Sequence, residues 1–391
     1  MDDLCGEPRI RISGPSGLLA AVPNMLGFHP TDSLVLMCFT GERYLLGPVA
    51  RVDLPRGRDP ELVRYLAGTA LTHADCVVVV CYPRRRRRPA ILDHLIAELG
   101  HAGVGVMTAL IVHAGRVWEA PSARPLRLAD SLLAPTQDDP TVQALAAANA
   151  LTGRVVLADR EQLRASIAGP CGGRGRVAEE AFTAVAQGIG ARLPDITPVV
   201  TDPRTHRVDP GSDGFDGFDG FDGPGAIAPL PDRVTRVIDC ALAEVSALGK
   251  LDVHLAAELA VACLDRSVRD GVLIRGVFEL DRTWLSMLIA VATWTPNPWA
   301  AGVCAVLTAI AYRHGDGALA QVSADRCLLA EPDNSLIQLL IAMMSGGLPP
   351  QALDGMLVRP DEFDGDDFGC DFDSHDFDGH DFGSDDGNAV A

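Results

Sequence analysis

Short apolar runs dominate the first 120 residues, and their pattern predicts β-strands. Residues 75–82, DCVVVVCY, form an unbroken run rich in β-branched residues, which is typical of a strand covered on both faces. The runs at 33–40 and 44–54 flank Gly41-Glu42 and predict a β-hairpin. We expect further strands at 9–13 and at 104–114, the latter ending near Trp118.

Helical spacing of apolar residues separates these strands. It predicts helices at 59–73 and 89–102, and Asp59 is the expected N-cap of the first because Asp favours that position. The apolar run after Ser16 predicts a short helix that ends at Pro23, since proline breaks helices. The order of elements predicts an α/β N-terminal domain with a mixed sheet and covering helices.

Beyond Trp118 the pattern is helical. Helices are expected at 141–151, 159–167, 177–192, 233–248, 252–265, 281–293, 299–314, 317–329, 335–345 and after Pro350. The stretch between the helices at 177–192 and 233–248 is rich in Pro, Gly and Asp and contains the repeat DGFDGFDGFDG. The predicted organisation is therefore an α/β domain at 1–193, a Gly/Asp/Phe/Pro linker at 194–231, an all-helical domain at 232–358 and a disordered acidic tail at 359–391.

Composition points to a cytoplasmic protein. The chain has 391 residues, 48% of them hydrophobic, so it can bury a sizeable core. We find no basic N-terminal segment followed by an apolar one, as in a signal peptide, and no apolar run of about 18 residues. No membrane contact is therefore expected. The ten cysteines form no CxxC pair and no zinc-ligand spacing, and seven of them lie in predicted strands or helices, which is typical of buried thiols in a reducing compartment. We expect neither a metal site nor a cofactor.

The net charge of −19 is concentrated outside the predicted domains. Seventeen acidic residues lie at 209–222 in the linker and at 361–386 in the tail, so the rest of the chain is nearly neutral. The one basic cluster is a candidate binding site, made of Arg84, Arg85, Arg86, Arg87 and Arg88. It predicts a solvated loop, an acidic partner, or an intramolecular contact with the tail. Nucleic acid is not expected as a partner, because the cluster has no interleaved aromatic residues and no groove-reading motif.

Candidate catalytic residues surround the polar turn at 28–33. His29, Asp32 and Ser33 lie in this turn, and Arg51 and Asp53 share one face of the neighbouring predicted strand. Together they contain a nucleophile, a base and a carboxylate, which are the ingredients of acyl or phosphoryl transfer. The alternative is structural: the Asp and Ser side chains bond their own backbone, and Arg51 forms an ion pair with Asp32.

The glycine-rich stretch at 169–176, GPCGGRGR, precedes a predicted helix and contains Cys171, a thiol that we expect to be exposed. A helix N-terminus can bind phosphate. However, the stretch has neither of the two common phosphate-loop patterns and follows no strand, so an ordinary loop is favoured.

Residues 26–35, LGFHPTDSLV, together with ARVDLP at 50–55 and VVVVCY at 77–82, resemble an actinobacterial family catalogued as domain of unknown function 4192. The resemblance covers residues 10–357 and implies a cytoplasmic protein, without an assigned activity or catalytic residues. The segment at 311–335 also resembles one tetratricopeptide unit, through Gly315, Ala320, Cys327 and Pro332. A single unit builds no solenoid, so this likeness predicts a helical hairpin or a short repeat stack that binds protein.

The function expected from these observations is a non-enzymatic interaction or regulatory module, with a protein partner bound through the helical domain. The competing function is a hydrolase or transferase with its site near the polar turn. The two differ in geometry: an open cleft with the candidate side chains in mutual reach favours an enzyme, and burial with mutual pairing favours a scaffold.

Overall fold

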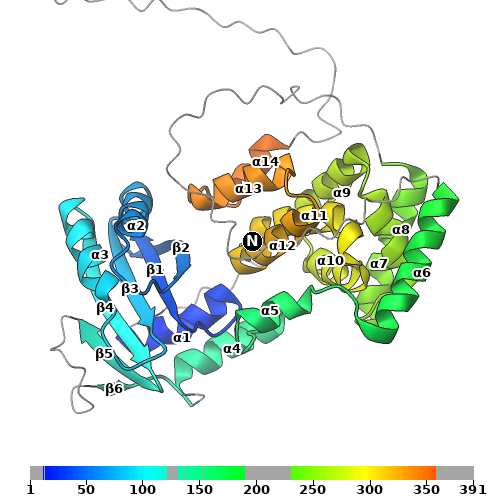
Figure 1. Cartoon of the computed structure of the whole chain (residues 1–391). Helices are drawn as coiled ribbons and strands as arrows, with labels where there is room; N and C mark the ends of the chain where they lie inside the picture. The colour runs from blue at the N-terminus through cyan, green and yellow to red at the C-terminus, as the bar shows by residue number, and fades with distance from the viewer. Residues whose placement is uncertain are drawn as a thin grey trace, which may run out of the picture.

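A mixed six-stranded sheet and a body of helices make up the structure, a computed structural model that describes residues 12, 14–120, 131–136, 138–152, 154–189 and 230–357 (Figure 1). This confirms the predicted fold class. The predicted strand at 9–13, almost all of the linker and the acidic tail lie outside the described residues. The strands are β1 Ser33–Thr40, β2 Leu45–Asp53, β3 Cys76–Tyr82, β4 Gly105–His113, β5 Arg116–Ala120 and β6 Leu132–Leu133.

Fourteen α-helices are present in the described part of the chain. They are α1 Gly14–Leu26, α2 Pro60–His73, α3 Ala90–His101, α4 Pro140–Thr152, α5 Arg160–Ser166, α6 Gly172–Ile189, α7 Asp232–Leu248, α8 Val253–Ala262, α9 Arg266–Glu279, α10 Arg282–Trp294, α11 Ala300–Arg313, α12 Gly317–Ala330, α13 Ser335–Ser345 and α14 Ala352–Met356. Side-chain caps set many of their starts: the Asp59 carboxylate, as expected, accepts a hydrogen bond from the backbone N–H of Leu62 at 3.1 Å.

The sheet order is β2-β1-β3-β4-β5-β6. Strand β1 pairs antiparallel with β2 and β3, and β3 pairs parallel with β4. Ser33 lies opposite Asp53 on one side and Tyr82 on the other, so the start of β1 and the ends of β2 and β3 share one edge of the sheet. The strand predicted at 104–114 is followed by a tight turn and a second strand, β5, which the sequence pattern did not resolve.

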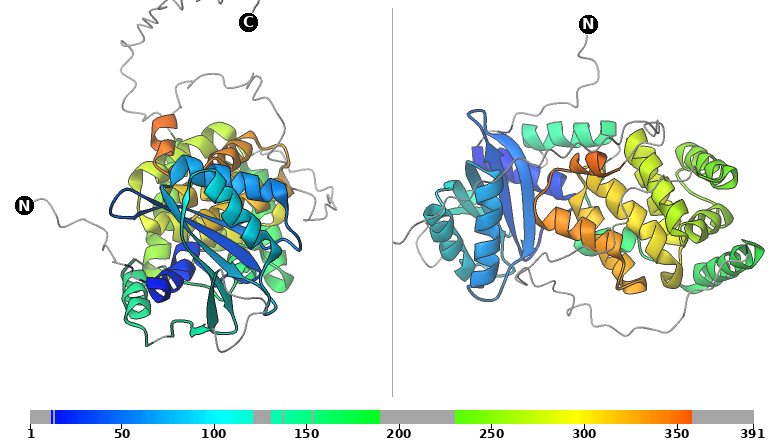
Figure 2. Two further views of the ribbon diagram at one scale, coloured as in Figure 1. Left: turned by 90° about the vertical axis from the view of Figure 1, so that its left-hand side faces the viewer. Right: turned by 90° about the horizontal axis from the view of Figure 1, so that it is seen from above.

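The two faces of the sheet bury different cores. One face, which includes Val77, Val79 and Leu34, packs beneath α2 and α3. Val79 is fully buried, as predicted for an interior strand. The opposite face, which includes Val35 and Val80, joins α1 and the helical body in one continuous cluster of buried residues. Seen from above, the sheet therefore separates α2 and α3 from the rest of the helices (Figure 2).

Helix α1 differs from its predicted end. It continues through Pro23 to Leu26. Proline removes one backbone donor, but Leu19, Val22 and Leu26 are buried in the core shared with β1, and this packing holds the last turn in place. The Asn24 side-chain amide also donates to the carbonyl oxygen of Ala20, one turn earlier, at 2.7 Å.

Two further helices depart from the sequence pattern. Helix α6 begins at Gly172, five residues before the predicted start, so much of the glycine-rich stretch is helical. Helix α9 was not predicted, and Asp265 caps it by accepting a hydrogen bond from the backbone N–H of Val268. The predicted boundaries assign α6 to the α/β domain, yet α6 packs against α8, and its Phe182 ring lies 5.9 Å from that of Trp299.

Candidate functional site

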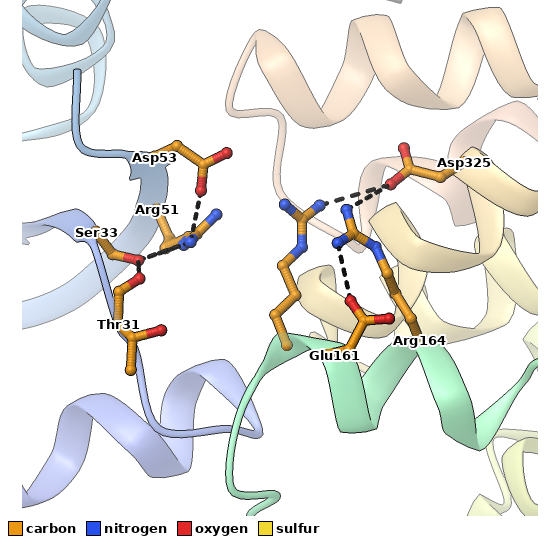
Figure 3. Close-up of polar contacts among 8 residues, drawn as sticks. Thr31, Ser33, Arg51, Asp53, Glu161, Arg164 and Asp325 are labelled. Atoms are coloured by element: carbon orange, nitrogen blue, oxygen red, sulfur yellow. Dashed lines mark hydrogen bonds and ion pairs between the residues drawn. The ribbon is translucent and has the colours of Figure 1, made fainter. Parts of the chain in front are cut away.

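Ser33 lies at the start of β1 with its hydroxyl fully engaged. The Oγ atom donates to the carbonyl oxygen of Thr31 at 2.7 Å and accepts from Arg51 Nε at 3.0 Å and Nη2 at 2.6 Å (Figure 3). The residue is completely buried. Its hydroxyl therefore has three partners and no contact with solvent, which fits a structural role better than that of a nucleophile.

Arg51 connects this buried hydroxyl to the protein surface. Its Nη2 atom lies 2.7 Å from Asp53 Oδ1, and the Arg51 side chain is 14% exposed whereas that of Asp53 is 79% exposed. The two residues share one face of β2, as their spacing predicts. The predicted set is thus assembled in part: Ser33, Arg51 and Asp53 form one hydrogen-bonded chain.

The other two predicted residues do not join this chain. Asp32 is exposed, has a positive φ of 48° and forms no ion pair with a described residue. The expected ion pair of Arg51 with Asp32 is wrong, because Arg51 pairs with Asp53 instead. Asp53 is the last residue of β2 and lies opposite Ser33, whereas Asp32 lies in the turn before β1. His29 is exposed, and its backbone N–H donates to the carbonyl oxygen of Leu157 at 3.0 Å.

A second charged group, from α5 and α12, faces the Arg51 pair (Figure 3). Asp325 Oδ2 lies 3.6 Å from Arg160 Nη2 and 3.8 Å from Arg164 Nη2. Burial lowers the pKa of Arg160, and the charges of Arg164 and Arg51 lower it further. We refer to Arg51, Asp53, Arg160, Arg164 and Asp325 as the charged junction.

The arginine run at 84–88 divides into two parts. Arg88 forms an ion pair with Asp93. Its Nε and Nη2 atoms donate to Asp93 Oδ1 at 2.9 and 2.5 Å, and its side chain is only 6% exposed. Burial lowers its pKa. The other four arginines, Arg84, Arg85, Arg86 and Arg87, are exposed and form no ion pair with a described residue.

Two further exposed arginines, which sequence reasoning missed, lie beyond the same end of the sheet. Arg56 and Arg58 follow β2 and are also exposed, and β2 and β3 end at the same edge of the sheet. The motif PRGRD directly after the strand was the available signal. We refer to Arg56, Arg58 and residues 84–87 as the basic edge.

The remaining features of the described residues give no sign of a metal site or a membrane span. No group of three or more His, Cys, Asp or Glu side chains there is placed to hold a metal ion. Within the same ranges, no helix has the length and apolar character needed to cross a membrane.

Comparison with known proteins agrees with the resemblance seen in the turn and the first strands. The sequence matches the family described as Domain of unknown function (DUF4192) over residues 15–351. The chain belongs to the DUF4192 family. The match begins in α1 and ends after α13, so the family unit includes the sheet, the charged junction and the basic edge. No curated protein and no solved structure matches the chain. The tetratricopeptide likeness of the α11–α12 region stays a prediction.

Proposed function

We propose that this DUF4192 protein is a non-enzymatic, cytoplasmic interaction module whose basic edge binds an acidic partner. The observation that carries the proposal is the concentration of six exposed arginines at one edge of the sheet, none of them paired with a described carboxylate. Unpaired guanidinium groups bind carboxylates and phosphates in a bidentate manner and are enriched where such groups are recognised.

The proposed chemistry favours a carboxylate-rich segment over a nucleic acid. The basic edge contains no aromatic side chain interleaved with its arginines, so it offers no stacking platform for bases. The acidic tail of this chain has the complementary charge and is tethered to the same molecule, which gives it a high effective concentration. In this proposal the tail competes with an external acidic partner. Protein binding by the helical domain is an additional proposal.

The competing proposal is a hydrolase or transferase at the polar turn. It draws support from the position of the turn beside the carboxyl end of β3, where ligands of α/β sheets bind. The geometry supports it less well, because the Ser33 hydroxyl donates to a carbonyl oxygen instead of a base and is buried. Hydrolysis of p-nitrophenyl acetate or phosphate that disappears in a folded Ser33→Ala variant would favour the enzyme.

Binding of a fluorescent polyglutamate peptide tests the interaction proposal. We compare full-length protein, protein lacking residues 361–391, and a variant in which residues 84–87 are changed to Gln. Deleting the tail should strengthen binding, and the quadruple variant should weaken binding about tenfold or more at low salt. Both effects should fade above about 0.5 M salt, because screening is then short-ranged.

A matched control changes four exposed arginines away from the basic edge and therefore lowers the net charge equally. The control substitutions are Arg43→Gln, Arg176→Gln, Arg236→Gln and Arg266→Gln. Binding by this control should stay within about twofold of the wild-type affinity. Equal loss in both quadruple variants would reduce the effect to net charge and reject the basic edge as a site.

A further inference from the structure

A groove of about 500 Å³ lies among the helices, outside the basic edge. Its sides are α12, the connection between α5 and α6, and the short turn at Pro296–Pro298 that precedes α11. This volume lies within the range of small-molecule sites. The groove borders the charged junction, because Arg164 and Asp325 belong to both.

Arg326 forms part of the groove and carries a buried charge without a carboxylate partner among the described residues. It is 7% exposed, and its guanidinium donates to the carbonyl oxygens of Ile167, of Ala292 at 2.7 Å and of Thr295 at 2.5 Å. Its Nε atom is buried without a hydrogen-bond partner. Carbonyl dipoles satisfy most of the donors but leave a full positive charge beneath the groove.

The close packing around this charge depends on Gly169. A Cβ atom at this position would lie 2.9 Å from the carbonyl oxygen of Thr295 and 3.0 Å from Arg326 Nη2. A side chain at this position therefore requires the Thr295 carbonyl to shift and the Arg326 guanidinium to move slightly. Arg326 and Gly169 therefore pack together and form the floor of the groove.

Charges of both signs surround the more open part of the groove. Arg164 is 45% exposed, and its distances of 3.6 Å to Glu161 and 3.8 Å to Asp325 exceed hydrogen-bonding range. Its guanidinium therefore keeps donors for another acceptor. Asp325 is 41% exposed, and Glu179 on α6 is exposed and forms no ion pair with a described residue. An anionic group thus finds Arg326 and Arg164, and a cationic group finds Asp325 and Glu179.

Apolar side chains complete the lining. Ile167 and Val322 are buried, and Leu329 is 46% exposed at the surface of α12. Pro296 and Pro298 contribute further apolar surface. The lining thus offers a cationic floor, two carboxylates and an apolar wall within one small volume.

We propose that this groove binds a small zwitterion with an apolar side chain, an α-amino acid in chemical class. Its carboxylate lies over the Arg326 floor and bonds to Arg164, its ammonium group faces Asp325 and Glu179, and its side chain packs on the apolar wall. This site goes beyond the proposed function, because none of its residues belongs to the basic edge. A failure of the polyanion experiment leaves it untouched.

Isothermal titration of full-length protein with L-leucine, L-methionine and L-phenylalanine tests the site. At least one of the three should bind with a dissociation constant of about 1 mM or tighter. Its amide, which lacks the carboxylate, and its N-acetyl derivative, which lacks the ammonium group, should each bind about tenfold more weakly or worse. No binding by all three amino acids, or equal binding of the amide or the N-acetyl derivative, overturns the proposal.

Paired variants separate the groove from general charge effects. Arg164→Gln and Glu179→Gln should each weaken binding about tenfold, whereas Arg176→Gln and Glu180→Gln, at exposed positions of α6 outside the lining, should leave it within about twofold. All four positions are exposed, so the variants are expected to fold, and circular dichroism verifies this. Equal effects within the Glu179 and Glu180 pair would assign the binding to another surface and reject the groove.

Discussion

Arg51 donates two hydrogen bonds to the Ser33 hydroxyl, which in turn donates to the Thr31 carbonyl oxygen. Ser33→Ala removes an acceptor from a guanidinium that is 14% exposed and a donor from the turn. The free energy of unfolding should fall by about 1–3 kcal/mol, because partly buried polar groups lose their partners. Urea denaturation measures it. Thr40→Ala, at the exposed far end of β1, is the control and should change stability by less than about 0.5 kcal/mol.

Val79 is fully buried in the interior strand β3. Val79→Asp places a carboxylate in the core beneath α2 and α3, where it has no partner, and should abolish cooperative folding. Met107→Asp on the neighbouring strand β4 is the control, since Met107 is 48% exposed. Soluble yield and thermal melting distinguish the two variants. A Val79→Asp protein with a normal melting transition would contradict the position assigned to β3.

Gly169 and Gly173 lie four residues apart and should respond oppositely to alanine. Gly169→Ala brings a Cβ atom to 2.9 Å from the Thr295 carbonyl oxygen, so it should destabilise the protein by about 1–3 kcal/mol. Gly173 is in α6 with nothing within 4 Å of its Cβ position, so Gly173→Ala should stabilise by up to about 1 kcal/mol. Equal changes in melting temperature would show that the floor of the groove tolerates a side chain.

Buried thiols make the protein sensitive to alkaline pH. Burial raises the pKa of Cys38 and Cys304 to about 11 and that of Cys81 and Cys263 to about 12, from the ordinary value of 9.0. Below pH 9 both the folded and unfolded states keep these protons, so stability is unaffected. As pH rises from 9 towards 11 or 12, only the unfolded state ionises, and stability falls by up to about 1.4 kcal/mol per pH unit for each thiol.

Denaturation midpoints measured between pH 8 and 10.5 check this dependence. Cys81→Ala should reduce the steepness of the fall, because it removes one thiol with a raised pKa. Cys171→Ala, at an exposed position, is the matched control for the removal of a thiol. An identical pH profile for wild type and Cys81→Ala would contradict the assignment of the effect to buried thiols.

The sequence predicts well those elements whose signal is local. The β-branched run of β3, the hairpin of β1 and β2, and the cap at Asp59 each depend on neighbouring residues, and all three are confirmed. Helix α9 was missed because Arg269, Arg275 and two glycines interrupt its apolar spacing. Gly276 in this helix lies against Ile310 and Trp284, so its role becomes visible only in the packed structure.

The candidate site was predictable only in part for the same reason. Ser33, Arg51 and Asp53 lie on adjacent strands of a hairpin, whose register follows from short-range pairing. Arg160 and Asp325 reach the same region from α5 and α12, and more than 100 residues separate them from β2. No spacing rule connects such positions. The predicted ion pair of Arg51 with Asp32 failed for a local reason. Asp32 lies in the turn before β1, where side chains do not follow the alternation of the strand.

Among the described residues, α1 and the helical body cover the sheet face that contains Val35 and Val80. The helical half therefore buries an apolar face of the sheet that would otherwise be exposed to solvent. Separating the two halves would expose apolar surface on both, so neither half is suited to evolve as an independent domain in another protein. We therefore expect the whole stretch from α1 to α13 to be inherited as one unit. The family match, which covers residues 15–351, agrees with this.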